Sequence, residues 1–178
     1  MIELQNLTKR FGELTAVNDV TLTVNRGEFF AVLGPNAAGK TTTIKMITGL
    51  IKPTSGNVRV AGHDVQAEPL EVRRRLAYVP DFVAFYPWMS VREALDYQAS
   101  FRSRWNSGLE RSLLDQFRLD PDAPTSGLSK GQRTQLALIG AIAAEPDLLV
   151  LDEPTSGLDP LVRREFIRTI IGAYQDAA

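Results

Sequence analysis

The feature that most constrains this chain is an apolar run that leads directly into a glycine-containing loop. Residues 29–34 read FFAVLG, and residues 34–42 read GPNAAGKTT. The uninterrupted apolar run predicts a strand buried on both faces, as in a parallel sheet, and a helix is predicted from Gly39 to Gly49. The loop matches G-x-x-x-x-G-K-T in the strand-to-helix context that this pattern requires, which predicts an α/β fold with a phosphate-binding P-loop.

The predicted loop offers several kinds of group to a phosphate. Its backbone N–H groups point inward, and the helix that follows adds the positive end of its dipole. Lys40 supplies a full positive charge, and Thr41 offers a hydroxyl to Mg²⁺. The alternative is a glycine-containing turn with a purely structural role. The candidate nucleotide-binding residues of the loop are Gly34, Pro35, Asn36, Ala37, Ala38, Gly39, Lys40, Thr41 and Thr42.

A second apolar run, LLVL at residues 148–151, ends in the adjacent carboxylates Asp152 and Glu153. We expect this strand to lie beside the P-loop strand, because ligands bind at the carboxyl ends of such parallel strands. Asp152 can then hold Mg²⁺ through water, and Glu153 can act as general base on an attacking water. The alternative is a polar strand end that precedes a turn at Pro154.

Composition excludes several other classes of protein. The net charge is −1, so the basic excess typical of nucleic-acid binders is absent and no nucleic-acid partner is predicted. The chain has no cysteine, which excludes disulfides and thiolate zinc sites. The longest apolar run, at 136–144, is shorter than the roughly 20 residues that a membrane span needs. We therefore expect a soluble protein whose membrane role requires a separate partner.

Along the chain, strand patterns at both ends enclose a helical middle. Turns are indicated at Gly12 and Gly27. Strands are predicted at 2–7, 20–34, 57–62, 76–79 and 147–152, and helices at 39–49, 90–105, 109–119, from Ser129 onward, and at 161–175. We predict one domain over 1–178. Residues 1–85 and 146–178 form its β-subdomain and core, and residues from about 86 to 145 form an inserted helical subdomain.

The segment LSKGQ, residues 128–132, predicts the start of a helix. Ser129 and Gln132 fit the capping-box pattern S-x-x-Q. Gly131 in the first turn leaves backbone N–H groups available to an anion. Taken alone, the segment is an ordinary helix start.

Together, the motifs form an ordered set: GPNAAGKT, LSKGQ, LLVLDEP and SGLD. Over the whole chain, this set resembles the nucleotide-binding domain of an ATP-binding cassette (ABC) ATPase. The resemblance implies a P-loop NTPase (RecA-like) parallel-sheet core, with an N-terminal antiparallel β-subdomain and an inserted α-helical subdomain. It also implies ATP and Mg²⁺ as cofactors and a transmembrane permease subunit as partner. The protein would then lie in the cytoplasm, at the inner face of the cell membrane.

The resemblance further implies pairing into a homodimer or a heterodimer with another ABC ATPase. Each ATP then lies between the P-loop of one subunit and the signature segment of the other, here Ser129, Lys130, Gly131 and Gln132. Phe11 occupies the position of the aromatic residue that stacks on adenine, although a packed turn residue is the alternative. Asp159, in SGLD, matches the loop that links the two sites.

Three positions depart from the family pattern. Ala37 stands where Gly is usual, and a positive φ there would cost roughly 1–2 kcal/mol. Lys130 also stands where Gly is usual, and a cation at a helix N-terminus is unfavourable by itself. Asp81, in YVPD, stands where the family has a Gln that contacts Mg²⁺ and the attacking water. An Asp can also reach a hard cation, but it adds negative charge beside ATP.

The variants YVPD and LSKG resemble bacterial exporter subunits, so export is the expected direction. The family also places a histidine beyond Glu153 that positions the attacking water, whereas the single histidine here is His63 in an upstream turn. We therefore carry the alternative of a truncated nucleotide-binding module that binds ATP but hydrolyses it poorly. A non-transport ABC ATPase is the third hypothesis.

An aromatic segment precedes the helical region, with Phe82, Phe85, Tyr86 and Trp88 in the stretch DFVAFYPWMS. One interpretation is core filling between subdomains. The other, implied by the resemblance, is a groove that receives a cytoplasmic helix of a membrane subunit. Exposed aromatic side chains would favour the second.

Overall fold

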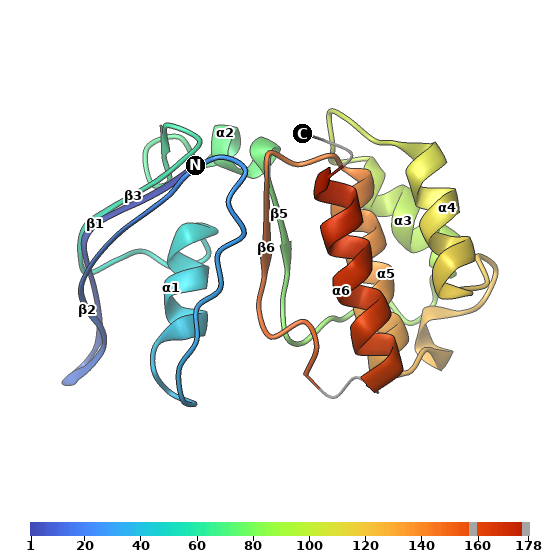
Figure 1. Ribbon diagram of the computed structural model, residues 1–178, viewed down its shortest axis with the longest axis horizontal. Helices are drawn as coiled ribbons and strands as arrows, with labels where there is room; N and C mark the ends of the chain where they lie inside the picture. The colour runs from blue at the N-terminus through green and yellow to red at the C-terminus, as the bar shows by residue number, and fades with distance from the viewer. Residues whose placement is uncertain (157–159, 176–178) are drawn as a thin grey trace. The chain divides into compact units, whose positions relative to one another are not determined.

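The computed structural model describes residues 1–156 and 160–175. The chain forms two compact units, Met1–Leu76 (unit 1) and Ala77–Ala178 (unit 2), whose elements are labelled in Figure 1. Each unit is described by itself. The predicted grouping of residues 1–85 with 146–178 around a helical insertion stays a prediction.

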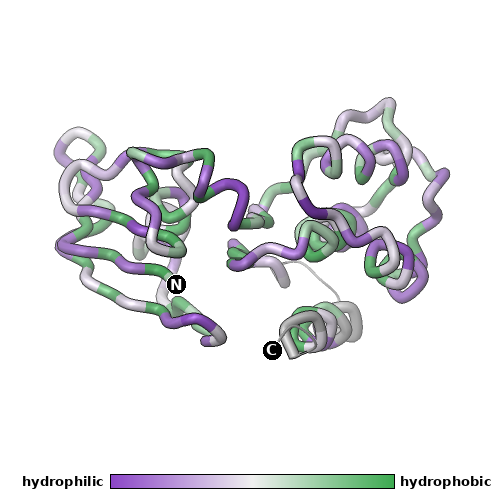
Figure 2. Tube along the Cα trace, turned by 90° about the horizontal axis from the view of Figure 1, so that it is seen from above, coloured by the Kyte–Doolittle hydropathy of each residue, from purple (hydrophilic) through white to green (hydrophobic). Residues whose placement is uncertain are grey.

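Unit 1 contains an antiparallel sheet in the order β2-β1-β3-β4. Its strands are β1 Ile2–Phe11, β2 Leu14–Val24, β3 Ser55–Val60 and β4 His63–Asp64. The β1–β2 hairpin turns at Gly12, whose φ is 58°, as the sequence predicted. Apolar and polar residues alternate along the strands (Figure 2), and Leu4 and Leu7 of β1 are both buried, with a register shift between them.

Two helices accompany this sheet, α1 Lys40–Ile47 and α2 Pro69–Arg75. Helix α1 lies within the predicted range 39–49, and its residues Met46 and Ile47 are buried. Helix α2 begins with Pro69 in its first turn and carries Arg73, Arg74 and Arg75 in its last, which suits the helix dipole.

The strand predicted at 29–34 is not formed. These residues have no regular secondary structure, and Leu33 is 91% exposed. An apolar run becomes a strand only where a neighbouring strand accepts its backbone hydrogen bonds. Among the residues that the structure describes, the two sheets are β2-β1-β3-β4 and β5-β6, and neither includes this run. The expected pairing of the P-loop strand with the strand before Asp152 would join the two units and stays a prediction.

Unit 2 combines a two-stranded parallel sheet with a helical layer. The sheet pairs β5 Leu76–Val79 with β6 Leu148–Leu151. The helices are α3 Val91–Ala99, α4 Ser107–Phe117, α5 Lys130–Ala143 and α6 Pro160–Gln175, with a short 3₁₀ turn at Thr125–Gly127. The buried α5 is the centre of the unit, and it packs against α3, α4 and α6.

The helices and strands of unit 2 share a buried apolar core. Leu95 of α3, Leu113 of α4, Leu136 of α5 and Phe166 of α6 belong to one buried cluster. A smaller cluster joins Ala77 and Val79 of β5 to Ala141 of α5. Helix α5 therefore packs against both the other helices and the sheet.

Within the described ranges, 1–156 and 160–175, we find no helix that is both long and apolar enough to cross a membrane.

Candidate nucleotide-binding site

The phosphate loop of unit 1 is fixed by its backbone. Gly39 is the N-cap of α1 with φ 84°, and a Cβ built there would lie 2.3 Å from the carbonyl oxygen of Ala16. No side chain fits that space. Ala37 has φ 66°, which confirms that the alanine at this position occupies the left-handed region that favours glycine.

Lys40 folds back over the loop that precedes it. Its Nζ donates hydrogen bonds to the carbonyl oxygens of Gly34 and Pro35, both at 2.9 Å. The amide of Ala38 donates to the Pro35 carbonyl at 3.3 Å, which closes a tight turn inside the loop. A cation therefore sits where the loop backbone converges, and residues 34–38 are exposed. We expect this arrangement to receive a phosphate chain.

Two further predicted residues belong to unit 1. Thr41 is exposed in the first turn of α1, on the solvent side expected for a hydroxyl that meets Mg²⁺. Phe11 ends β1 with half of its surface exposed, and Lys9 Nζ lies 5.0 Å from its ring centroid. An exposed ring supported by a cation suits stacking on a base better than it suits core packing.

The predicted carboxylates lie at the end of β6 in unit 2. Asp152 is only 3% exposed, and its amide donates to the Val79 carbonyl at 2.9 Å, which ties it to β5. Glu153 is exposed and has φ 47°. A non-glycine residue held with positive φ is costly, and such positions cluster at functional sites.

Tyr78 is a site residue that the sequence reasoning missed. Its hydroxyl donates to Asp152 Oδ2 at 3.4 Å. Burial, followed by the negative charge of Asp152, raises the pKa of Tyr78 to about 12, so the phenol keeps its proton. Strand alternation contained the signal: Ala77 and Val79 face the core, so Tyr78 must face the other side of the sheet.

The helix start at Ser129 has the predicted capping box. The Ser129 hydroxyl accepts from the Gln132 amide at 3.2 Å, and Gln132 Oε1 accepts from the Ser129 amide at 3.0 Å. Two backbone donors are thus satisfied, and Lys130 and Gly131 begin α5 with Ser129 and Lys130 exposed. Lys130 Nζ lies 3.4 Å from Asp81 Oδ1 on the loop after β5.

Two predicted features remain apart from this geometry. Asp159 lies outside the described residues. His63 lies in β4 of unit 1, where its Nδ1 is 3.0 Å from Glu68 Oε1, which agrees with the expected turn or surface role. The hydrogen bond from His63 lowers the pKa of Glu68.

The oxygen ligands that the described residues offer decide whether Mg²⁺ fits this site. Among the described residues, no cluster of three or more His, Cys, Asp or Glu side chains could hold a metal by itself. Mg²⁺ on a nucleotide does not need one, because it is bound by one or two protein oxygens together with phosphates and water. Thr41 in unit 1 and Asp152 in unit 2 have this chemistry. Their joint site spans the two units and stays a prediction.

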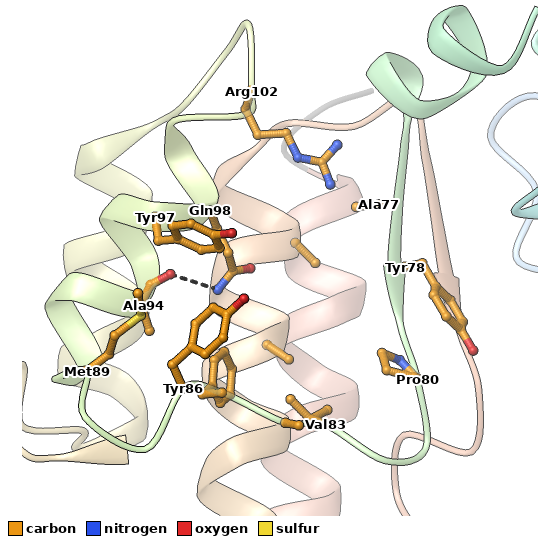
Figure 3. Close-up of a pocket in the computed structure, with 14 residues that line it drawn as sticks. Ala77, Tyr78, Pro80, Val83, Tyr86, Met89, Ala94, Tyr97, Gln98 and Arg102 are labelled. Atoms are coloured by element: carbon orange, nitrogen blue, oxygen red, sulfur yellow. Dashed lines mark hydrogen bonds between the residues drawn. The ribbon is translucent and has the colours of Figure 1, made fainter. Parts of the chain in front are cut away.

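A pocket of about 430 Å³ opens in unit 2, with Tyr78 and Pro80 among its lining residues (Figure 3). Its lining includes Tyr86, Tyr97, Gln98 and Arg102, with Ala137 and Ala141 of α5 behind them. The Tyr86 and Tyr97 rings meet edge-on, 5.8 Å between centroids, and their hydrogen bond raises the pKa of Tyr97. Burial lowers the pKa of Arg102.

The residues of the aromatic segment before α3 do not all fit the same predicted role: one fits core filling, and two fit an interaction surface. Phe85 packs against the helical core, as core filling requires. Phe82 and Trp88 are 78% and 73% exposed, and Trp88 stacks on Tyr86 with ring centroids 4.8 Å apart. Exposed aromatic rings beside an apolar pocket are typical of an interaction site.

The loop, the helix that it opens and the α/β framework define a P-loop NTPase. A family model described as "ABC transporter" matches residues 17–156. The chain belongs to this family.

Two curated relatives and one solved structure show the range of the similarity. The chain is 40% identical over 171 residues to "Probable multidrug ABC transporter ATP-binding protein YbhF" of Escherichia coli (strain K12), covering 93% of this chain and 30% of that protein. It is 37% identical over 182 residues to "Spermidine/putrescine import ATP-binding protein PotA" of Pseudomonas aeruginosa (strain UCBPP-PA14), covering 99% and 50%.

The solved structure is titled "Dimeric structure of a post-hydrolysis state of the ATP-binding cassette MJ0796 bound to ADP and Pi". It shares 25% identity with this chain at a TM-score of 0.84, covering 99% of this chain and 84% of that one. The chain thus spans 30% and 50% of the two curated relatives.

Proposed function

We propose that this chain is the ATP-binding and ATP-hydrolysing subunit of an ABC transporter, in which binding of Mg-ATP drives pairing of two cassettes and powers a membrane partner. The observation that carries the proposal is the phosphate loop. Gly39 admits no side chain, and Lys40 places its ammonium over the loop carbonyls. These features suit a polyphosphate in particular, because a lysine ammonium lies beside the loop backbone at the start of a helix, where anions bind.

In this proposal, each residue of the loop and of the strand ends has its own role in ATP hydrolysis. Phe11 stacks on the base, and the loop amides and Lys40 hold the phosphates. Thr41 and Asp152 would hold Mg²⁺, which when bound would supply positive charge to the phosphate oxygens. Glu153 accepts a proton from the attacking water, and Asp81 orients that water or the metal. Tyr78 keeps the Asp152 carboxylate in place through its hydroxyl.

Pairing places the start of α5 against a partner's nucleotide. The capping box fixes the first turn of this helix, so the segment Ser129–Gln132 presents a stable surface to phosphate. A dimeric relative bound to ADP and Pi supports this arrangement. The partner cassette is a second copy of this chain or another ABC ATPase, and Asp159 is proposed to link the two sites.

The pocket of unit 2 is proposed as the docking site for a cytoplasmic helix of the permease. Its apolar lining with Tyr86 and Tyr97 suits an amphipathic helix. The protein then works in the cytoplasm, peripherally on the inner face of the membrane. Export is the proposed direction, because YVPD and LSKG resemble exporter subunits, although one relative is named as an importer.

A second candidate function is a nucleotide-binding module with weak turnover. The observation that favours it is the position of His63, the single histidine of the chain, which is engaged by Glu68 in unit 1 far from β6 in the sequence. This candidate predicts ATP binding without hydrolysis that depends on Glu153.

The two functions are separated by measuring ATP binding and phosphate release on the purified chain. Hydrolysis that falls at least 100-fold in Glu153→Gln, with MgATP affinity retained, supports the enzyme. Glu71→Gln, an exposed carboxylate on α2 paired with Arg74, is the matched control and retains full turnover. Binding with wild-type turnover equal to that of Glu153→Gln supports the second candidate. Absence of ATP binding contradicts both.

A further inference from the structure

Two positions at which this chain departs from the family pattern are in contact with each other. Lys130 Nζ lies 3.4 Å from Asp81 Oδ1, and 49 residues separate them in the sequence. Asp81 is on the loop that follows β5, and Lys130 is the first residue of α5. Both belong to unit 2, and both side chains are about half exposed, at 51% and 53%.

Each residue alone carries an electrostatic penalty. A lysine at the first position of α5 opposes the positive end of the helix dipole. An aspartate beside bound ATP repels the phosphates, because it adds a negative charge where the family has an uncharged glutamine. In the pair, the Asp81 carboxylate lies 3.4 Å from the Lys130 ammonium, so each charge is compensated by the other. The two departures therefore offset one another.

We propose that the Asp81–Lys130 ion pair positions the loop after β5 relative to the start of α5, so that the two residues serve ATP hydrolysis as one unit. Asp81 and Lys130 are positioning residues in this proposal, which rests on the proposed function. The pair links a residue that faces the subunit's own nucleotide to the segment that faces the partner's nucleotide. It thereby fixes Ser129 and Gly131 relative to Asp81.

Because the Asp81–Lys130 pair is about half exposed, we expect it to position the two segments rather than to stabilise the fold. Ion pairs that are about half exposed contribute little to the free energy of unfolding. Another exposed pair in the same unit, Arg92–Asp122 at 3.8 Å, offers a matched comparison because it involves none of the proposed site residues. Neutralising that pair should leave turnover and MgATP affinity unchanged.

The test is a double-mutant cycle of Asp81→Gln and Lys130→Gln in the full chain, with turnover and MgATP affinity as readouts. We expect each single variant to lower turnover about tenfold, because it leaves the other charge uncompensated, and the double variant to recover to within about threefold of wild type. Lys130→Arg, which keeps the pair, should rescue the Lys130 position. Raising the salt concentration should slow the wild type and leave the double variant unaffected.

The same cycle is also measured as MgATP affinity in the Glu153→Gln background, where no turnover is needed. That arm stays informative if the proposed ATPase activity fails. Non-additivity in either readout, with Arg92→Gln/Asp122→Asn unchanged, supports the proposal. Effects that multiply independently in both readouts overturn it, as does an equal loss in the Arg92–Asp122 control. Urea unfolding of every variant confirms that the losses do not come from instability.

Discussion

The phosphate loop of unit 1 and the site segments of unit 2 are built by different means. The loop is exposed and depends on backbone torsions, with φ 66° at Ala37 and 84° at Gly39. The segments of unit 2 depend on side chains, with Asp152 buried beside Tyr78 and Ser129 in a reciprocal pair with Gln132. The first should therefore be sensitive to an added Cβ, and the second to the loss of a polar atom.

The largest expected effect tests the backbone side of this comparison. Gly39→Ala places a Cβ against the Ala16 carbonyl and forces an unfavourable φ, so unit 1 should lose about 2–5 kcal/mol in its free energy of unfolding and MgATP binding should be abolished. Gly27→Ala is the control, because its φ of 79° is similar but nothing lies within 4 Å. Equal losses in urea unfolding would show that torsion, and not the close approach, dominates.

The next effect tests the side-chain part. Ser129→Ala removes the cap of α5 and should lower the free energy of unfolding of unit 2 by about 1 kcal/mol. Ser129→Asn keeps an acceptor at the same position and should lose far less. Urea unfolding followed by circular dichroism measures both. If the two variants lose the same amount, the hydrogen bond to the Gln132 amide is not what stabilises the helix start.

A smaller change of opposite sign is expected at Ala37. Replacement by glycine relieves a positive φ that costs roughly 1–2 kcal/mol, and the flexibility of glycine in the unfolded chain takes back about 0.5–1 kcal/mol. Ala37→Gly should therefore raise the free energy of unfolding by about 0.5 kcal/mol. Thermal unfolding at a fixed scan rate detects this, and a lower melting temperature would mean that the loop needs the alanine methyl group.

The smallest effect at neutral pH concerns Tyr78. Its pKa is raised to about 12 in the fold, so its contribution to stability is complete below its unfolded pKa near 10 and is lost as the pH rises toward 12. Tyr78→Phe should be only slightly less stable than wild type near pH 8 in unfolding experiments, because the hydrogen bond that it loses is a long one, and it should lack this component of alkaline loss. An identical decline in both proteins above pH 10 would contradict the raised pKa.

The sequence predicted the elements whose signal is local. Gly12 marked the hairpin turn, and Ser129 with Gln132 predicted the capped start of α5, because turn torsions and capping bonds are determined by residues a few positions apart. The helix after the predicted P-loop was also found, at Lys40–Ile47 within the predicted range 39–49, and the binding role of the loop stays a prediction.

What the sequence did not predict depends on distant neighbours. Residues 29–34 have the composition of a buried strand but no partner strand among the described residues, so the apolar pattern alone gave the wrong element. The contact between Asp81 and Lys130 joins residues 49 positions apart, and no local rule could have indicated it. The same holds for Tyr78 and Asp152, which meet only because β5 pairs with β6.

The left-handed conformation of Glu153 has a practical consequence for protein engineering. A carboxylate that is held at φ 47° is kept against the preference of its own backbone, whereas asparagine and glycine adopt this region more readily. Substitution of Glu153 by asparagine should therefore yield a protein that is at once chemically inert and harder to unfold. Stability and ATP turnover therefore make opposite demands on this single position. A hydrolysis-deficient variant that is used to trap a nucleotide complex can then be more stable than the wild type.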